Sequence, residues 1–220
     1  MLREEEVKPR KGTSIVEFMG HCMWRDAWQL APCTDFKTLI NWNILPGATA
    51  PVLFLHLKRL AKLRKDQGVR VVFGIDFVQN SVLVMSYDQF KDMALQIRSF
   101  FEEELGDYHK FFFVNCARCP QLLGEGYGQN ITEINQMLEM ETGWNGFRPC
   151  DPAKTLERKK SSDTCEYGRV VVKPTRWCET RDFPSQHAMT AFCRYLRTYV
   201  DTQLVYLTRL KEMEGRRMIG

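Results

Sequence analysis

Three short apolar runs, separated by helical patterns, constrain the fold of this chain more than any other feature. The runs are Ser14–Met19, Val69–Ile75 and Lys110–Val114. The middle one is rich in β-branched residues and free of polar alternation, as in strands buried on both faces of a sheet. Helical patterns precede the second and the third run, at Ala50–Asp66 and Ser86–Leu105. Strands and helices alternating at this spacing predict a parallel sheet with right-handed crossovers, and therefore a three-layer α/β/α domain.

Local signals predict the remaining elements. Ser86, with Gln89 three residues later, is typical of a capping box, and Asn130 is expected to cap a helix over Ile131–Glu141. A short helix over Cys22–Leu30 and a long final helix from Ser185 to about Glu214 are also expected. In the Ala50–Asp66 helix the apolar stripe is predicted at Leu53, Leu57, Leu60 and Leu63. The predicted sheet contains strands that begin at Ser14, Lys37, Val69, Lys110 and Arg169.

Size and composition favour one domain. Hydrophobic residues make up 44% of the 220 residues, which is enough for one core, so we expect a flexible tail at residues 1–12 and a single domain at residues 13–220. The polar stretch Gly143–Glu166 predicts an exposed insertion. No run reaches the roughly 18 apolar residues of a membrane span, and no apolar signal region opens the chain. We therefore expect a soluble, cytoplasmic protein whose eight cysteines are reduced.

Cys116 and Cys119 form a Cys-x-x-Cys pair that is compatible with a zinc site or a redox pair. A zinc site would need a second close pair, whereas the later cysteines are single and widely spaced. The interpretation as structural thiols is favoured, and no metal is expected. Gly124, Gly126 and Gly128 do not have phosphate-loop spacing, and no cofactor is expected.

Glycine turns follow the first three predicted strands, and their residues resemble the first three sequence blocks of the SGNH (GDSL-like) hydrolase family. The matching positions are Gly20-His21-Cys22, Gly47 and Gly74-Ile75-Asp76. In that family the first block carries a nucleophilic serine. Its backbone amide, the second-block glycine and a third-block asparagine form the oxyanion hole, and a late Asp-x-x-His supplies the base. The resemblance implies the same three-layer fold.

The same resemblance implies a degenerate active site. Cys22 stands at the nucleophile position, and Asp76 replaces the asparagine with a carboxylate that would repel an oxyanion. The late block reads Asp182-Phe183-Pro184-Ser185, with Ser185 in place of the histidine. We therefore expect no enzymatic activity. One alternative is an esterase-like hydrolase that pairs the Cys22 thiol with His187, since cysteine and histidine form a working couple. A protein-interaction scaffold is another.

Among SGNH-like proteins without the catalytic set, the chain resembles the OSK domain family, which lies at the carboxyl end of the insect germ-plasm protein Oskar. The resemblance covers roughly residue 13 to the carboxyl terminus. It rests on retained glycines with replaced catalytic residues and on a long basic final helix. It implies binding to 3′ untranslated regions of messenger RNA, a role in germ-granule assembly and a location in ribonucleoprotein granules of the germ plasm.

Basic residues independently permit RNA binding. Asp66 is the only acid between Val52 and Gly74, so positive charge is segregated there, and such a patch can neutralise phosphates. The opposing interpretation is that these residues form solvated helix faces. No RRM or KH motif is present, so contacts would be electrostatic, with Tyr195 or Tyr199 available for stacking. The predicted RNA-binding residues are Lys58, Arg59, Lys62, Arg64, Lys65, Arg70, Arg194, Arg197, Arg209 and Lys211.

Overall fold

The structure is a computed structural model of the 220-residue chain. It describes residues 14–24, 38–118, 122, 126–141, 147–152, 155, 157–159, 170–172 and 186–217. At residues 22, 157–159, 170–172, 186–187 and 206–217 the backbone alone is described. The predictions made for residues 1–12, Cys119 and Ser185 lie outside these ranges.

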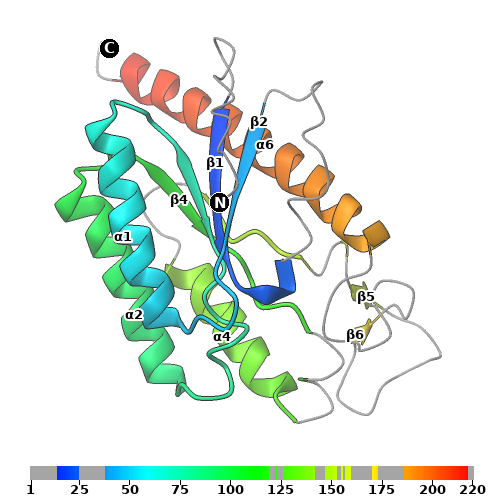
Figure 1. Ribbon diagram of the computed structural model, residues 1–220. Coiled ribbons are helices and arrows are strands. Elements are labelled where there is room, and N and C mark those ends of the chain that lie inside the picture. The colour runs from blue at the N-terminus through cyan, green and yellow to red at the C-terminus, as the bar shows by residue number, and fades with distance from the viewer. Residues whose placement is uncertain are drawn as a thin grey trace.

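A parallel four-stranded sheet forms the centre of the molecule (Figure 1). Its strands are β1 (Ser14–Gly20), β2 (Thr38–Ile44), β3 (Val72–Ile75) and β4 (Lys110–Phe113), and their order is β2-β1-β3-β4. Every neighbouring pair is parallel. The predicted α/β fold class is confirmed, and all strands present their carboxyl ends at one edge of the sheet.

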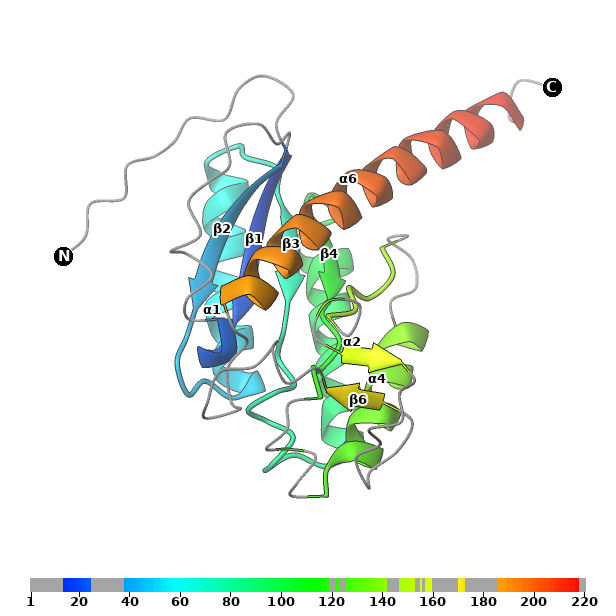
Figure 2. The same cartoon turned by 90° about the vertical axis from the view of Figure 1, so that its right-hand side faces the viewer.

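Helices cover both faces of this sheet (Figures 1 and 2). On one face lie α1 (Ala50–Asp66) and α2 (Tyr87–Ser99), with α4 (Gly128–Glu141) packed against α2. The long helix α6 (Gln186–Arg217) crosses the other face, and its carboxyl half extends beyond the remaining elements. The three predicted layers are therefore present.

Aromatic side chains fill the spaces between the layers. The rings of Phe73 and Phe101 lie 5.5 Å apart on the α1 and α2 side, and Phe18 lies 6.1 Å from Phe192 on the α6 side. Gly74 is required by this packing, because an added Cβ would lie 2.6 Å from Cζ of Phe112. Large rings thus anchor helices to both faces of the sheet.

The last predicted strand exists but does not join the central sheet. It is β6 (Val170–Val172), which pairs antiparallel with β5 (Glu157–Lys159) in a separate two-stranded sheet. Beside β4, an isolated parallel bridge joins Val114 to Cys150 instead. The prediction of a fifth strand in the central sheet was wrong, because a short β-branched run indicates that a strand forms but not which strand it pairs with.

The helices differ from prediction in several details. The capping box of Ser86 and Gln89 is confirmed, with both reciprocal hydrogen bonds formed. Asn130 is no cap, since α4 already begins at Gly128. In α1 the buried stripe uses Ala61 where Leu63 was expected, and Leu63 is half exposed.

The end of α2 is also irregular. It continues into a π-helical turn, η3 (Phe100–Glu104). The chain then leaves through Gly106 and Asp107, both at positive φ. Within the described ranges, no helix has the length and apolar character that crossing a membrane requires.

Candidate functional site

The carboxyl edge of the sheet brings together the residues that follow β1, β2 and β3. The Leu45 N–H donates to the Gly20 carbonyl at 2.9 Å, and the Asp76 N–H donates to the Met19 carbonyl at 2.9 Å. Gly47, at φ 70°, follows in the turn after β2. The structure therefore gathers the segments that carry Cys22, Gly47 and Asp76 at one edge, as the sequence predicted.

A buried polar cluster occupies the centre of this edge. The indole Nε1–H of Trp24 donates to Oδ2 of Asp76 at 2.5 Å, and Nε2 of His21 lies 3.1 Å from the same oxygen. The backbone N–H of Met23 donates to Nδ1 of His21 at 3.4 Å, which is consistent with a proton on Nε2. All three side chains of the cluster are almost inaccessible to solvent. We call Asp76, His21 and Trp24 the edge cluster.

Trp24 connects the edge cluster to the final helix. Its ring stacks on Phe192 of α6, with centroids 4.4 Å apart, and meets Phe18 edge to face at 5.5 Å. A Cβ at Gly20 would lie 2.7 Å from Cδ1 of Trp24, so only glycine fits there without a shift. Trp24 was not predicted as a site residue, although it lies only two residues after Cys22.

The carboxylate of Asp76 limits the chemistry available at this edge. Both of its contacts are made by Oδ2, whereas Oδ1 is buried and accepts no hydrogen bond from the described residues. A carboxylate has no proton to offer an oxyanion, unlike the amide of asparagine. Asp76 therefore acts as an acceptor that holds His21 and Trp24.

The other candidate catalytic positions are described only in part. Cys22 opens the 3-10 turn η1 (Cys22–Trp24), and its side chain is not described. His187 is the second residue of α6, also with backbone alone, and residues 182–185 lie outside the described ranges. The distance between the Cys22 thiol and a base therefore stays a prediction.

Loops on the α1 side hold the Gly47 turn. The Ala50 N–H donates to Oγ of Ser81 at 2.7 Å, and Nδ2 of Asn80 donates to the Ala48 carbonyl at 3.3 Å. The loop after β3 is thus hydrogen-bonded to the start of α1 and to the residue before it.

Cys116 is a buried residue near this edge. Its Sγ lies 3.1 Å from Oε1 of Gln79, and Asn135 of α4 hydrogen-bonds both its backbone N–H and its carbonyl. These contacts give it a structural place between β4 and α4. Across the residues that the structure describes, no three His, Cys, Asp or Glu side chains are grouped to hold a metal ion.

Acidic residues from other elements neutralise part of the predicted RNA-binding face. Lys58 and Lys62 both reach Glu104 of η3, at 3.6 and 3.1 Å, and the hydrogen bond from Lys62 is the main cause of a lowered pKa for Glu104. Arg64 pairs at 2.8 Å with Glu17, which is buried in β1. Arg64 is therefore only partly solvated and already paired, a contact that a count of local acids could not reveal, and its role as a phosphate contact stays a prediction.

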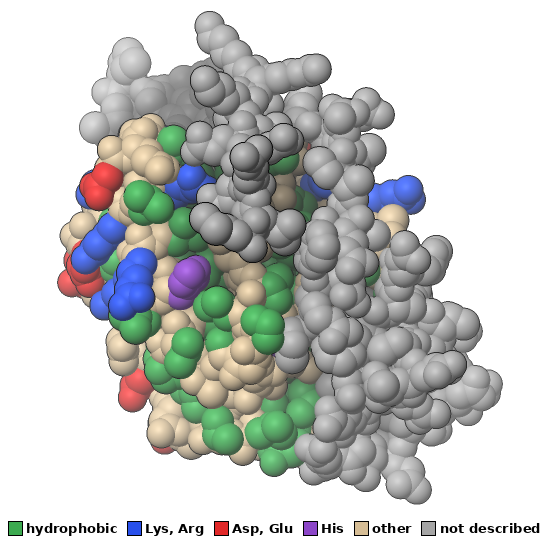
Figure 3. Space-filling view, viewed as in Figure 1, with side chains coloured by type: hydrophobic (Ala, Val, Ile, Leu, Met, Phe, Trp, Pro, Cys, Tyr) green, Lys and Arg blue, Asp and Glu red, His purple; other side chains and the backbone are tan. Residues whose placement is uncertain are grey.

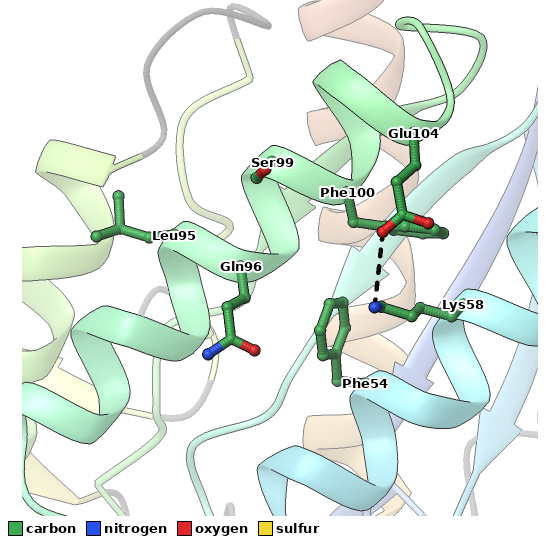
Figure 4. Close-up of a pocket in the computed structure, with 7 residues that line it drawn as sticks. All are labelled: Phe54, Lys58, Leu95, Gln96, Ser99, Phe100 and Glu104. Atoms are coloured by element: carbon green, nitrogen blue, oxygen red, sulfur yellow. Dashed lines mark ion pairs between the residues drawn. The ribbon is translucent and has the colours of Figure 1, made fainter.

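A shallow groove of about 350 Å³ lies between α1 and the end of α2 (Figure 4). Lys58 crosses it to Glu104, and its ammonium lies 4.6 Å from the centroid of Phe54 and 5.6 Å from that of Phe100. The groove is therefore bridged by an internal ion pair.

Four basic residues of this face stay exposed. They are Arg59, Lys62, Lys65 and Arg70. Figure 3 shows blue lysine and arginine side chains gathered over α1, with red acidic side chains at their margin. The Lys65 ammonium and the Arg70 guanidinium lie 6.0 Å and 5.1 Å from the centroid of the half-buried Tyr108 ring. The sequence analysis did not identify Tyr108.

The basic residues of α6 lie on the opposite face of the sheet (Figure 2). Arg194 is exposed, whereas Arg197 is buried, so the expectation that Arg197 contacts phosphate was wrong. Arg209 and Lys211 are in the helix with backbone alone described.

Tyr195 and Tyr199 of α6 are internal packing residues. The Tyr199 hydroxyl donates to the Arg148 carbonyl, its ring packs 5.1 Å from Phe112, and burial raises the pKa of both Tyr195 and Tyr199. Neither ring is therefore a free stacking platform.

Comparisons with known proteins identify the architecture. No protein-family model and no curated protein matches the sequence. Among solved structures, the chain is similar to a protein of Bacteroides fragilis assigned as an acylhydrolase, with a TM-score of 0.60, 14% identity and 92% of each chain covered. A GDSL-like lipase of Bacteroides thetaiotaomicron gives 0.60 at 16% identity, over 90% of this chain and 91% of that one. A lipase/acylhydrolase of Enterococcus faecalis gives 0.54 at 11% identity, over 87% and 96%. At these identities the likeness concerns the fold, and the chain has an SGNH-hydrolase-like fold.

Proposed function

We propose that this chain is a noncatalytic RNA-binding domain on an SGNH-hydrolase-like frame. Its resemblance to OSK domains makes 3′ untranslated regions of messenger RNA, within germ-plasm granules, the expected ligand. The observation that carries the proposal is the pair of exposed cations, Lys65 and Arg70, that both lie near the ring of Tyr108. Two positive charges beside an aromatic ring offer single-stranded RNA both phosphate contacts and a stacking surface.

The edge cluster supports the noncatalytic part of the proposal. Asp76 stands where the fold's hydrolases have an oxyanion donor, and its carboxylate is occupied by His21 and Trp24. A substrate oxyanion placed there would meet a buried negative charge instead of a donor. The cluster stabilises the turn after β1 without needing catalysis to explain it.

The exposed cations define a smaller RNA-binding surface than the full basic set. The exposed cations are Arg59, Lys62, Lys65 and Arg70, whereas Arg64 is paired with the buried Glu17 and Arg197 is itself buried. Lys65 also donates to the Leu105 carbonyl at 3.1 Å, which fixes its ammonium near Tyr108. We therefore centre the surface on Lys65, Arg70 and Tyr108.

The test is fluorescence anisotropy with a uridine-rich single-stranded fragment of a 3′ untranslated region, measured at several salt concentrations. The double variant Lys65→Gln/Arg70→Gln should weaken binding roughly tenfold, and each lost contact should lower the salt slope by about 0.7. The control Lys91→Gln/Arg148→Gln removes the same charge from exposed residues elsewhere. Equal weakening by both variants, with intact circular dichroism, would show only a general charge effect and reject the surface.

A second candidate function is a thiol-dependent ester hydrolase. The observation that favours it is the stack of Trp24 on Phe192, which brings the η1 turn that contains Cys22 next to the first turns of α6, where His187 lies. A short-chain p-nitrophenyl ester distinguishes the two functions. The noncatalytic proposal expects no turnover above the heat-denatured protein. Turnover that both Cys22→Ala and His187→Ala abolish would replace it with the hydrolase.

A further inference from the structure

The outer face of α1 carries apolar side chains in solvent. Val52, Leu55 and Leu63 are 54%, 52% and 50% exposed. Their spacing of three and eight residues places them along one side of the helix, away from the buried Leu53 and Leu57. The core does not explain them, since the sheet-facing side of α1 is already filled by other residues.

The loop before α2 extends this apolar surface at the start of α1. Leu83 and Val84 are 47% and 69% exposed, and Ser81, two residues earlier, accepts a hydrogen bond from the Ala50 N–H. Figure 3 shows green hydrophobic side chains recurring over α1 and below it. We call Val52, Leu55, Leu63, Leu83 and Val84 the outer stripe. A contiguous exposed apolar surface that is bordered by polar residues often marks a site of interaction with another molecule.

The charge inside the outer stripe identifies the kind of partner. Arg59 lies one turn from both Leu55 and Leu63, is exposed, and has no ion-pair partner in the described part of the chain. Lys62 lies beside it. A second copy of α1 is disfavoured, because antiparallel pairing centred on this segment would bring the two Arg59 guanidinium groups together. RNA is also disfavoured as the partner, because its phosphates would pair with the cations and would not bury Leu55 and Leu63.

We propose that the outer stripe binds an acidic amphipathic helix of a partner protein, with its apolar residues against Leu55 and Leu63 and a carboxylate against Arg59. Two helices packed in this way place apolar residues at i, i+4 and i+7 of the partner on the stripe. A carboxylate pairs with the guanidinium at the centre of the contact, where partial desolvation strengthens the interaction. Arg59 and Lys62 also belong to the exposed cations of the RNA proposal, whereas the apolar residues of the outer stripe do not, so binding of a helix to the stripe does not depend on RNA binding at Lys65, Arg70 and Tyr108.

The test is selection from a displayed library of 18-residue helices with leucine fixed at i, i+4, i+7 and i+11 and the other positions randomised. The full chain is the target, and the variant Leu55→Ser/Leu63→Ser is the counter-target. We expect the enriched helices to carry Asp or Glu beside the leucine face. The best helix should bind at least tenfold more weakly to Leu55→Ser/Leu63→Ser. The control Met140→Ser, at a more exposed apolar position on α4, should leave its affinity unchanged.

Charge reversal tests the pairing with Arg59. The variant Arg59→Glu should lose the acidic helix and recover binding when the facing carboxylates of that helix are replaced by lysine. Failure to enrich any helix against the counter-target, or enrichment without acidic residues, would overturn the proposal. Loss of RNA affinity in Leu55→Ser/Leu63→Ser would also overturn it and assign the stripe to RNA. The variant Lys65→Gln/Arg70→Gln should still bind the selected acidic helix, so helix binding can be tested independently of the RNA proposal.

Discussion

Glu17 of β1 and Arg64 of α1 are joined by an ion pair in which both the guanidinium Nε and an Nη of Arg64 lie 2.8 Å from Oε1 of Glu17. Glu17 is only 1% exposed. Asn41 and Asn43 of the neighbouring strand donate to its two oxygens at 3.1 and 2.8 Å. A carboxylate can remain buried when its charge is paired and its oxygens are hydrogen-bonded, and this network fastens α1 to β1 and β2.

Breaking this pair should destabilise the fold. Arg64→Gln leaves the buried Glu17 without its countercharge, and we expect a loss of about 1–3 kcal/mol in the free energy of unfolding, measured by urea denaturation. Arg59→Gln is the matched control, because this exposed residue lies on the same helix, and its effect should stay within about 0.5 kcal/mol. Equal effects of the two variants would contradict a structural role for Arg64.

The bond between Trp24 and Asp76 should appear as a coupling energy. Trp24→Phe removes the indole donor together with some packing, whereas Asp76→Ala removes the acceptor. In a double-mutant cycle the lost packing cancels, and we expect the two residues to couple by about 1 kcal/mol in unfolding free energy. Additive effects would mean that Trp24 acts through its stack on Phe192 alone.

Gly74 should tolerate no side chain while Phe112 is present. A Cβ there would lie 2.6 Å from Cζ of Phe112 and 3.2 Å from Cδ2 of Phe18, both inside a filled core. Gly74→Ala should cost about 1–3 kcal/mol in urea unfolding. In a Phe112→Leu background the ring is gone, and the same substitution should cost less than half as much. Equal costs in both backgrounds would refute the clash.

The sequence predicted the elements that local patterns determine. The strands beginning at Ser14 and Lys110, the α1 helix and the capping box of Ser86 all appear near their predicted positions, because periodicity and caps involve residues close in the chain. The partner of β6 was wrong, since strand pairing depends on distant residues. For the same reason the local charge count missed Glu17 and Glu104.

The sequence predicted where the candidate site lies, but it did not predict which side chains contact one another there. The glycine turns located the carboxyl edge of the sheet, and the parallel register brought their segments together. The contacts of Asp76 with His21 and Trp24 could not be predicted, because they depend on how the chain turns after β1 and brings both partners to the residue that follows β3. Tyr108 could not be predicted as part of the basic surface, because it is distant in sequence from Arg70, which lies in another loop.

His109 is expected to make the fold sensitive to mild acid. The ring is fully buried, its Nε2–H donates to the Ala61 carbonyl at 2.9 Å, and Nδ1 accepts the Val71 N–H at 3.3 Å. Both nitrogens are therefore engaged as in the neutral imidazole. Burial lowers the pKa of His109 below its ordinary value of 6.5, and the positive charges of Lys65 and Arg70 lower it further. The hydrogen bond to Ala61 and the charge of Glu17 oppose this shift without reversing it.

The sign of the pH effect follows from proton uptake. Below about pH 6.5 the unfolded chain protonates this histidine while the native protein does not, so acid favours unfolding. The stabilisation is complete above pH 6.5 and declines as the pH falls towards the lowered native pKa, with a slope of at most about 1.4 kcal/mol per pH unit. Urea unfolding between pH 7.5 and 5.5 should show this decline. His109→Gln should be less stable at pH 7.5 and have a flatter pH profile, whereas His56→Gln, on the outer side of α1, should keep the slope. An unchanged slope in His109→Gln would show that another group causes the acid sensitivity.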